Sequence, residues 1–175
     1  MKLNSCALFI GLSLILPIRA QEAASKPSAA EVVDIPAAHA QLNIKAGSIK
    51  ITFSDGHMEV VGKNGNCMDP HVSGKGDVGW TQCTEFNAKD YAMNQKLVVR
   101  LPVGRTKEFA PNPKAPFITR WKFVDNDSAV LIRSMSFHGP QSYIRYDLAT
   151  GRMTNKKDGT NDAEPVPKWA QPLGD

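Results

Sequence analysis

Residues 48–61 read SIKITFSDGHMEVV and contain the strongest signal for secondary structure in the chain. Up to Phe53 its apolar residues alternate with lysine and threonine, which is the period of a strand with one buried face. Asp55-Gly56 comes next, a dipeptide typical of tight hairpin turns. After the turn, methionine and valine return at alternate positions. The stretch therefore predicts a β-hairpin.

The same two-residue period continues along the rest of the chain. A single turn of helix is predicted over residues 32–39, where Pro36 limits its length. Residues 102–116 carry four prolines and are expected to form an irregular connection, because proline is excluded from the middle of a sheet. The further strands predicted from alternation cover residues 77–83, 95–101, 117–123, 128–135 and 142–148.

The N-terminus has the composition of a secretory signal. Lys2 precedes the apolar run CALFIGLSLIL at residues 6–16, which fits the ~7–15 residues of a signal core and is shorter than the roughly 20 residues that span a bilayer. Cleavage is expected after Ala20, or else after Ala23 or Ala24. The mature protein is then expected in the periplasm or secreted, with no transmembrane segment.

The sequence divides into four regions by composition. The cleaved signal covers residues 1–20, a flexible leader 21–40, the β-rich domain 41–154, and an extended proline-rich C-terminal segment 155–175. The formal net charge of +4 falls to about +2 when Lys2 and Arg19 leave with the signal, and the remaining charges of both signs are mixed. This distribution lacks the basic patch that nucleic-acid binding requires.

Two segments resemble each other: residues 70–80, PHVSGKGDVGW, and residues 118–131, ITRWKFVDNDSAVL. Each reads as a strand, a tight turn and a second strand, and the second unit continues to YDLATG at residues 146–151. Over residues 70–153 the pattern resembles the repeat units of WD40-like and TolB-like β-propellers, as found in small exported bacterial proteins. The matching residues are Ser73, Gly76, Val78, Trp80, Tyr146, Asp147, Leu148, Thr150 and Gly151.

The length of the chain limits what these units can build. A closed propeller needs at least four blades of about 40–45 residues each, which is more than the mature chain offers. The predicted fold is therefore all-β and a single domain. It is either a partial, propeller-like arrangement or a compact sandwich of two or three small antiparallel sheets. Such a resemblance implies a fold and leaves the function open.

Two cysteines, Cys67 and Cys83, remain after signal cleavage. An even pair in an oxidising compartment is typical of a structural disulfide. The alternatives are a metal pair or a redox couple. Zinc would need two more ligands nearby, and a redox couple would need closer spacing.

The sequence contains short matches to motifs for catalysis and cofactor binding, but the residues around them do not fit these functions. GKGDVG at residues 74–79 spells GxGxxG, but a strand follows it where a dinucleotide site needs a helix. The mature sequence contains neither a GxSxG elbow nor an HExxH helix. Asp125-Asn126-Asp127 lacks the later glycine and glutamate of an EF-hand calcium loop and reads as a turn. We therefore predict no cofactor, no metal site and no catalytic residue.

Four residues are candidates for binding: Trp80, Trp121, His71 and His138. The two tryptophans occupy related positions in the two repeat-like units, where they serve either as core anchors or as an aromatic binding face. His138 belongs to a His-Gly-Pro loop, and loops on a rigid scaffold often carry function.

These observations favour an exported, non-enzymatic binding domain whose ligand is another protein, such as the inhibitor or immunity partner of a secreted enzyme. The first alternative is a metal-binding protein or metal-assisted hydrolase that uses His71, His138 and nearby aspartates. The second is a structural component of the cell envelope. The expected mode of association is a homodimer or a complex through an open sheet edge. Residues 48–54 and 142–148 are the predicted edges.

Overall fold

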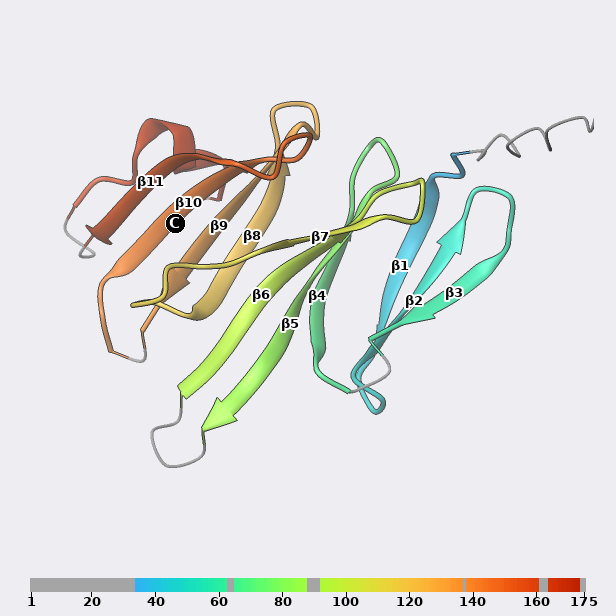
Figure 1. Cartoon of the computed structure of the whole chain (residues 1–175), viewed down its shortest axis with the longest axis horizontal. Helices are drawn as coiled ribbons and strands as arrows, with labels where there is room; N and C mark the ends of the chain where they lie inside the picture. Colours follow the sequence, from blue (N-terminus) through green and yellow to red (C-terminus); the bar gives the residue numbers. More distant parts are fainter. Residues whose placement is uncertain (1–33, 63–64, 88–91, 137, 161–163, 174–175) are drawn as a thin grey trace, which may run out of the picture. The chain divides into compact units, whose positions relative to one another are not determined.

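The computed structural model describes residues 34–62, 65–87, 92–136, 138–160 and 164–173. Over these residues the chain forms eleven strands in three antiparallel sheets and one short 3₁₀ helix. The predicted fold class, all-β with small antiparallel sheets, is therefore confirmed (Figure 1).

The first sheet contains the hairpin predicted from the sequence. It consists of β1 (Ala37–Asn43), β2 (Ser48–Phe53) and β3 (Met58–Val61). The turn between β2 and β3 closes with hydrogen bonds from Phe53 N to His57 O (3.0 Å) and from Gly56 N to Phe53 O (2.9 Å). Gly56 has a φ of 88°, a conformation that glycine adopts without steric cost.

The start of this sheet differs from the prediction. Strand β1 begins at Ala37, inside the region expected to be a flexible leader and in place of the expected helical turn over residues 32–39. Pairing with β2, in the register Leu42 to Ile49 and Ala40 to Ile51, gives these residues an extended conformation. The predicted signal and most of the leader lie outside the described residues.

The second sheet consists of β4 (Cys67–Val72), β5 (Val78–Asn87), β6 (Ala92–Arg100) and β7 (Thr106–Phe109). Strand β7 lies within the proline-rich stretch 102–116 that was expected to be irregular throughout. It has four residues and forms an edge of the sheet. The prolines flank β7, so they remove no hydrogen bond from the ladder.

The third sheet consists of β8 (Phe117–Val124), β9 (Ala129–Met135), β10 (Gln141–Asp147) and β11 (Met153–Thr160). The 3₁₀ helix η1 (Lys168–Leu173) follows it. Both β11 and η1 extend into residues 155–175, so the expected extended C-terminal segment is partly a sheet strand and partly a helix. Among the described residues, no helix is long and apolar enough to cross a membrane.

All three sheets are meanders, in which strands that follow each other along the chain are also neighbours in space. The first and last strand of each sheet are therefore its edges. Residues 48–54 and 142–148, predicted as open edges, correspond to β2 and β10, which are paired on both sides. The edge prediction is thus wrong for both stretches.

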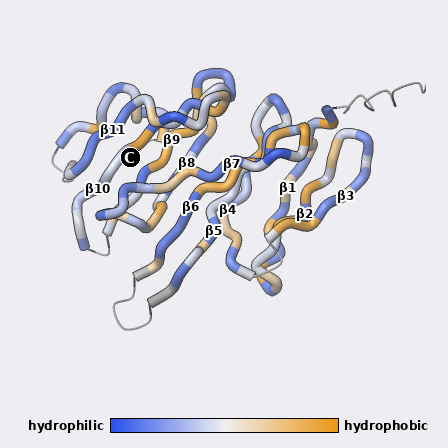
Figure 2. Tube along the Cα trace, in the orientation of Figure 1, coloured by the Kyte–Doolittle hydropathy of each residue, from blue (hydrophilic) through white to orange (hydrophobic). Residues whose placement is uncertain are grey.

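The sheets pack face to face through apolar clusters, and Figure 2 shows that hydrophobic residues recur along their strands. The consecutive residues Leu97, Val98 and Val99 of β6 are 0%, 5% and 0% exposed. Val98 belongs to the cluster shared with the first sheet, whereas Leu97 and Val99 belong to the cluster shared with the third. Because side chains alternate between the faces of a strand, this run shows that the middle sheet is buried on both faces.

Polar contacts hold the connection between β7 and β8 against the third sheet. The side-chain nitrogen Nδ2 of Asn112 donates to Ser142 Oγ (3.2 Å) and to Asp158 Oδ1 (2.7 Å). The hydroxyl of Tyr146 donates to the carbonyl of Ala110 at 2.7 Å. These bonds fix a proline-rich segment that has few backbone donors of its own.

Helix η1 covers the outer face of the third sheet with Ala170 and Leu173, which pack against Leu131 and Tyr143. We expect Leu173→Ala to lower the free energy of unfolding by about 2–3 kcal/mol, because it removes buried methyl groups and leaves a cavity. Chemical denaturation measures this change. The matched control is Gln171→Ala, at an exposed position of the same helix, where we expect a change within about 0.5 kcal/mol. Equal effects of the two substitutions would contradict this packing.

Candidate functional site

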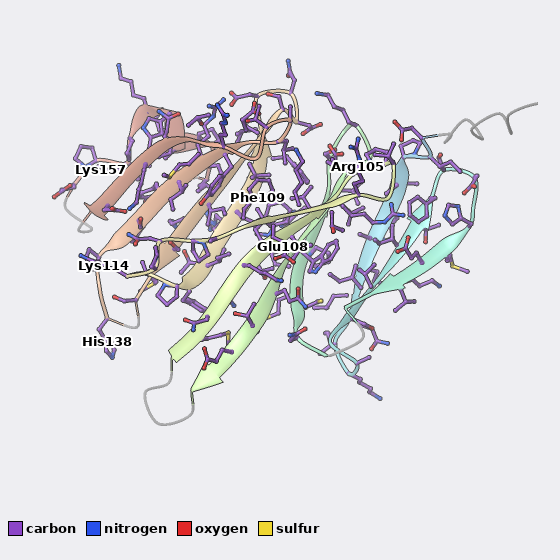
Figure 3. All side chains as sticks on the ribbon, in the orientation of Figure 1. Arg105, Glu108, Phe109, Lys114, His138 and Lys157 are labelled. Carbon is purple, nitrogen blue, oxygen red and sulfur yellow. The ribbon has the colours of Figure 1, made fainter. Side chains whose placement is uncertain are left out.

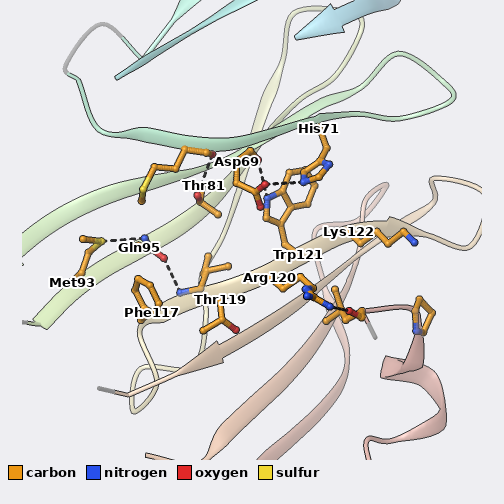
Figure 4. Close-up of a pocket in the computed structure, with 14 residues that line it drawn as sticks. Asp69, His71, Thr81, Met93, Gln95, Phe117, Thr119, Arg120, Trp121 and Lys122 are labelled. Atoms are coloured by element: carbon orange, nitrogen blue, oxygen red, sulfur yellow. Dashed lines mark hydrogen bonds and ion pairs between the residues drawn. The ribbon is translucent and has the colours of Figure 1, made fainter. Parts of the chain in front are cut away.

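A groove with a volume of about 710 Å³ opens between β4 of the middle sheet and β8 of the third sheet (Figure 4). Both strands are sheet edges, so the groove forms where two adjacent sheets are joined by side chains and have no shared ladder. Its lining comes from four strands and η1: Met68, Asp69, His71, Thr81, Met93, Gln95, Phe117, Ile118, Thr119, Arg120, Trp121, Lys122, Pro172 and Leu173.

Trp121 forms the inner wall of the groove. It is 2% exposed and packs in the apolar cluster between the middle and third sheets. Its ring lies directly over Gly79 of β5, where a Cβ atom would be 2.3 Å from Cη2 of the tryptophan. Gly79 is therefore required for this close approach, which gives a packing role to the last glycine of the GKGDVG stretch.

Asp69 organises the β4 side of the groove. The pairing of β4 with β5 is interrupted between Met68 and His71, and Asp69 has a φ of 51°. Such a bulge re-aims the side chains of an edge strand. The carbonyl of Asp69 accepts a hydrogen bond from Nε1 of Trp121 (3.2 Å), and its carboxylate Oδ1 lies 3.0 Å from Nε2 of His71.

His71 stands edge-on to Trp121, with ring centroids 4.8 Å apart. The hydrogen bond to Asp69 raises the pKa of His71 above its ordinary value of 6.5, while partial burial and the charge of Lys122 oppose this shift. The imidazole is therefore held in place by one residue, Asp69, which also fixes the indole of Trp121. The two aromatic rings form one preorganised wall.

The opposite side of the groove is formed by β6 and the start of β8. The side-chain oxygen of Gln95 accepts a hydrogen bond from the backbone nitrogen of Ile118 at 2.7 Å. This bond satisfies a donor of the edge strand β8, which would otherwise be open to pairing with another strand. Met93 and the half-exposed Phe117 complete an apolar rim here.

The hydroxyl groups of the groove are bonded to the backbone. Thr81 Oγ1 donates to the carbonyl of Met68 (3.1 Å), and Thr119 Oγ1 donates to the carbonyl of Arg133 (3.2 Å). A nucleophilic hydroxyl needs a neighbouring base as its hydrogen-bond acceptor. Neither threonine has that arrangement.

Of the four binding candidates, the structure brings His71 and Trp121 together in this groove. Trp80 is 5% exposed and lies in the cluster between the first and middle sheets, on the other face of β5 from Gly79. His138 is exposed in the loop between β9 and β10 (Figure 3) and is not among the groove residues. The other groove residues were not among the named candidates, and they include Asp69, Met93, Gln95, Phe117, Arg120 and Lys122.

The residues considered for a metal site form a turn. Asp125, Asn126 and Asp127 all have positive φ between β8 and β9, and the carboxylate of Asp125 pairs with Arg145. Within the described part of the chain, no three His, Cys, Asp or Glu side chains are grouped as metal ligands would be.

The disulfide expected from the sequence is not formed in the structure, where Cys67 and Cys83 are both free thiols. Cys67 is opposite Gln82 in the register of β4 and β5, so Cys83, the next residue, projects from the other face of the sheet. Cys67 is buried beside Trp80 in the first cluster. The sulfur of Cys83 donates to the carbonyl of Glu85 at 3.5 Å.

Comparison with models of protein families, with curated proteins and with solved structures finds no match to this chain.

On this geometry we expect Cys67 and Cys83 both to be labelled when unreduced protein is treated with a thiol reagent after unfolding. In native protein, Cys83 should react first. Cys67 should react slowly, because burial both shields its thiol and raises its pKa. Mass spectrometry of the labelled peptides measures both rates. Absence of label on unfolded, unreduced protein would instead show the disulfide that the sequence suggested.

We expect Asp69→Asn to lower the pKa of His71 towards its ordinary value, because the largest cause of the upward shift is the hydrogen bond to Asp69. A histidine with a raised folded-state pKa contributes stability below its unfolded pKa of about 6.5, and this contribution is lost as pH rises through the higher folded value. NMR titration of the His71 ring gives the pKa directly.

The matched control is Asp55→Asn, which removes the same kind of partner from His57 (2.6 Å) in the first sheet and should leave His71 unchanged. An identical His71 titration in Asp69→Asn and the unmodified protein would show that Asp69 has no influence on the imidazole.

Proposed function

We propose that the protein is an exported, non-enzymatic binding domain, and that the groove between β4 and β8 holds a segment of another protein. The observation that carries this proposal is the groove itself: an open, mostly apolar cavity with two preorganised aromatic rings on one wall. Sites of this size with few polar groups are typical of ligand recognition. Export is inferred from the signal-like residues 1–20.

The state of the edge strands favours recognition by side chains over addition of a strand. Three backbone groups of β4 and β8 beside the groove are already bonded, since Met68 O, Asp69 O and Ile118 N pair with Thr81, Trp121 and Gln95. An incoming strand would have to displace these side chains. A segment that inserts apolar side chains beside Phe117 and Met93 would leave the bonds intact.

The bonding of the hydroxyl groups also supports binding over catalysis. Thr81 and Thr119 donate to backbone carbonyls, and His71 is paired with Asp69. In this arrangement His71 and Asp69 shape the surface of the groove, and neither of its two threonines is placed for activation.

A photo-crosslinking amino acid placed at Phe117 in the full chain tests the proposal in the source cells. We expect one defined protein adduct, because Phe117 lies at the groove and is 39% exposed. The control position is Met58 on β3, which is 59% exposed and lies outside the groove. It should give no such adduct.

The adduct should fall about tenfold when Met93→Asp places a carboxylate on the apolar rim, since burial of an unpaired charge is costly. Equal adducts from both positions, or an adduct that Met93→Asp leaves unchanged, would contradict binding in the groove.

A further inference from the structure

The charges that line the groove are unbalanced. Among its described residues, Asp69 supplies the one carboxylate, while His71, Arg120 and Lys122 supply basic groups. Asp69 is already paired with His71. Arg120 donates to the carbonyl of Leu173. Lys122 is exposed and has no ion pair within the described part of the chain.

His71 and Lys122 influence each other across the groove. His71 comes from β4 and Lys122 from β8, on the two edge strands that border the cavity (Figure 4). Both residues are exposed at the groove, and the positive charge of Lys122 opposes the protonation of His71. An anion bound in the groove would attract both groups and offset this effect.

We infer that the groove selects a partner segment that carries a carboxylate next to its apolar side chains, and that Lys122 and protonated His71 hold this carboxylate. The inference rests on the proposed function and adds the chemistry of the ligand. The apolar rim of Met68, Met93 and Phe117 accommodates the apolar part of the segment, and the basic residues complement its charge.

The net charge of the groove depends on pH through the pair formed by Asp69 and His71. The charged groups facing His71 are Asp69 from its own strand and Lys122 from β8, and Trp121 packs against its ring. When His71 is neutral, the ionised Asp69 offsets Lys122. When His71 is protonated, the pair is neutral and Lys122 is no longer offset. Binding of a carboxylate should therefore strengthen as pH falls through the titration of His71.

Two dyes with the same aromatic skeleton separate charge from apolar contact. 8-Anilino-1-naphthalenesulfonate is an anion, and N-phenyl-1-naphthylamine is neutral. We expect both to bind the full mature chain, with Lys122→Gln weakening the anionic dye about 1.5-fold to fivefold, the range of an exposed charge pair. The neutral dye should be unaffected. The matched control is Lys50→Gln, at an exposed lysine of β2 outside the groove, which should change neither dye.

The pH dependence of binding is measured with the same two dyes. Acidification should tighten the anionic dye and leave the neutral one unchanged, and His71→Gln should remove this dependence. If Lys122→Gln weakens both dyes equally, or acidification affects both alike, the charge selectivity is overturned while the groove remains a binding site. If neither dye binds the unmodified protein, the proposed function itself fails.

The crosslinked partner provides the decisive readout. Lys122→Gln should reduce the adduct formed at Phe117, and Lys50→Gln should leave it unchanged. A dye response without any change in the adduct would show that the groove attracts small anions, and would overturn the assignment of the carboxylate to the protein partner.

Discussion

The contact between Trp121 and Gly79 sets the spacing of the middle and third sheets. Without a Cβ atom at Gly79, the indole ring reaches the backbone of β5 while its nitrogen bonds to the bulged strand β4. The same contact belongs to the apolar cluster between the middle and third sheets and shapes the wall of the groove between β4 and β8. The packing of the two sheets and the shape of the groove thus depend on one aromatic ring, so the groove wall has the rigidity of a protein core.

The fold class was readable from the sequence because β2, the first strand of the hairpin, buries one face, although Met58 and Val60 of β3 are exposed. Ile49, Ile51 and Phe53 are all core residues, as their alternation indicated. Strands β7 and β11 were missed for a physical reason: both are edges, and β11 is largely exposed. An exposed edge strand is stabilised by pairing with its neighbour and therefore leaves little hydrophobic pattern in its sequence.

The site was only partly predictable. His71 and Trp121 were candidates by residue type, but their contact joins β4 to β8, fifty residues apart along the chain. Asp69 acquires its role from a local bulge that no periodicity reveals. In the sequence, Gln95 is indistinguishable from the other polar residues of its strand. In the structure it is buried and accepts a hydrogen bond from the edge strand of another sheet. The resemblance to propeller repeats stays a prediction.

The meander order has a consequence for how the protein loses its structure. Since each sheet consists of consecutive strands, each sheet is built from one continuous stretch of chain, and a terminal sheet can detach by opening a single interface. The middle sheet belongs to two clusters, so it cannot open without breaking both. The domain therefore behaves as a short linear array with nearest-neighbour coupling, in which fraying proceeds from the ends and the last unit to unfold is the one in the centre.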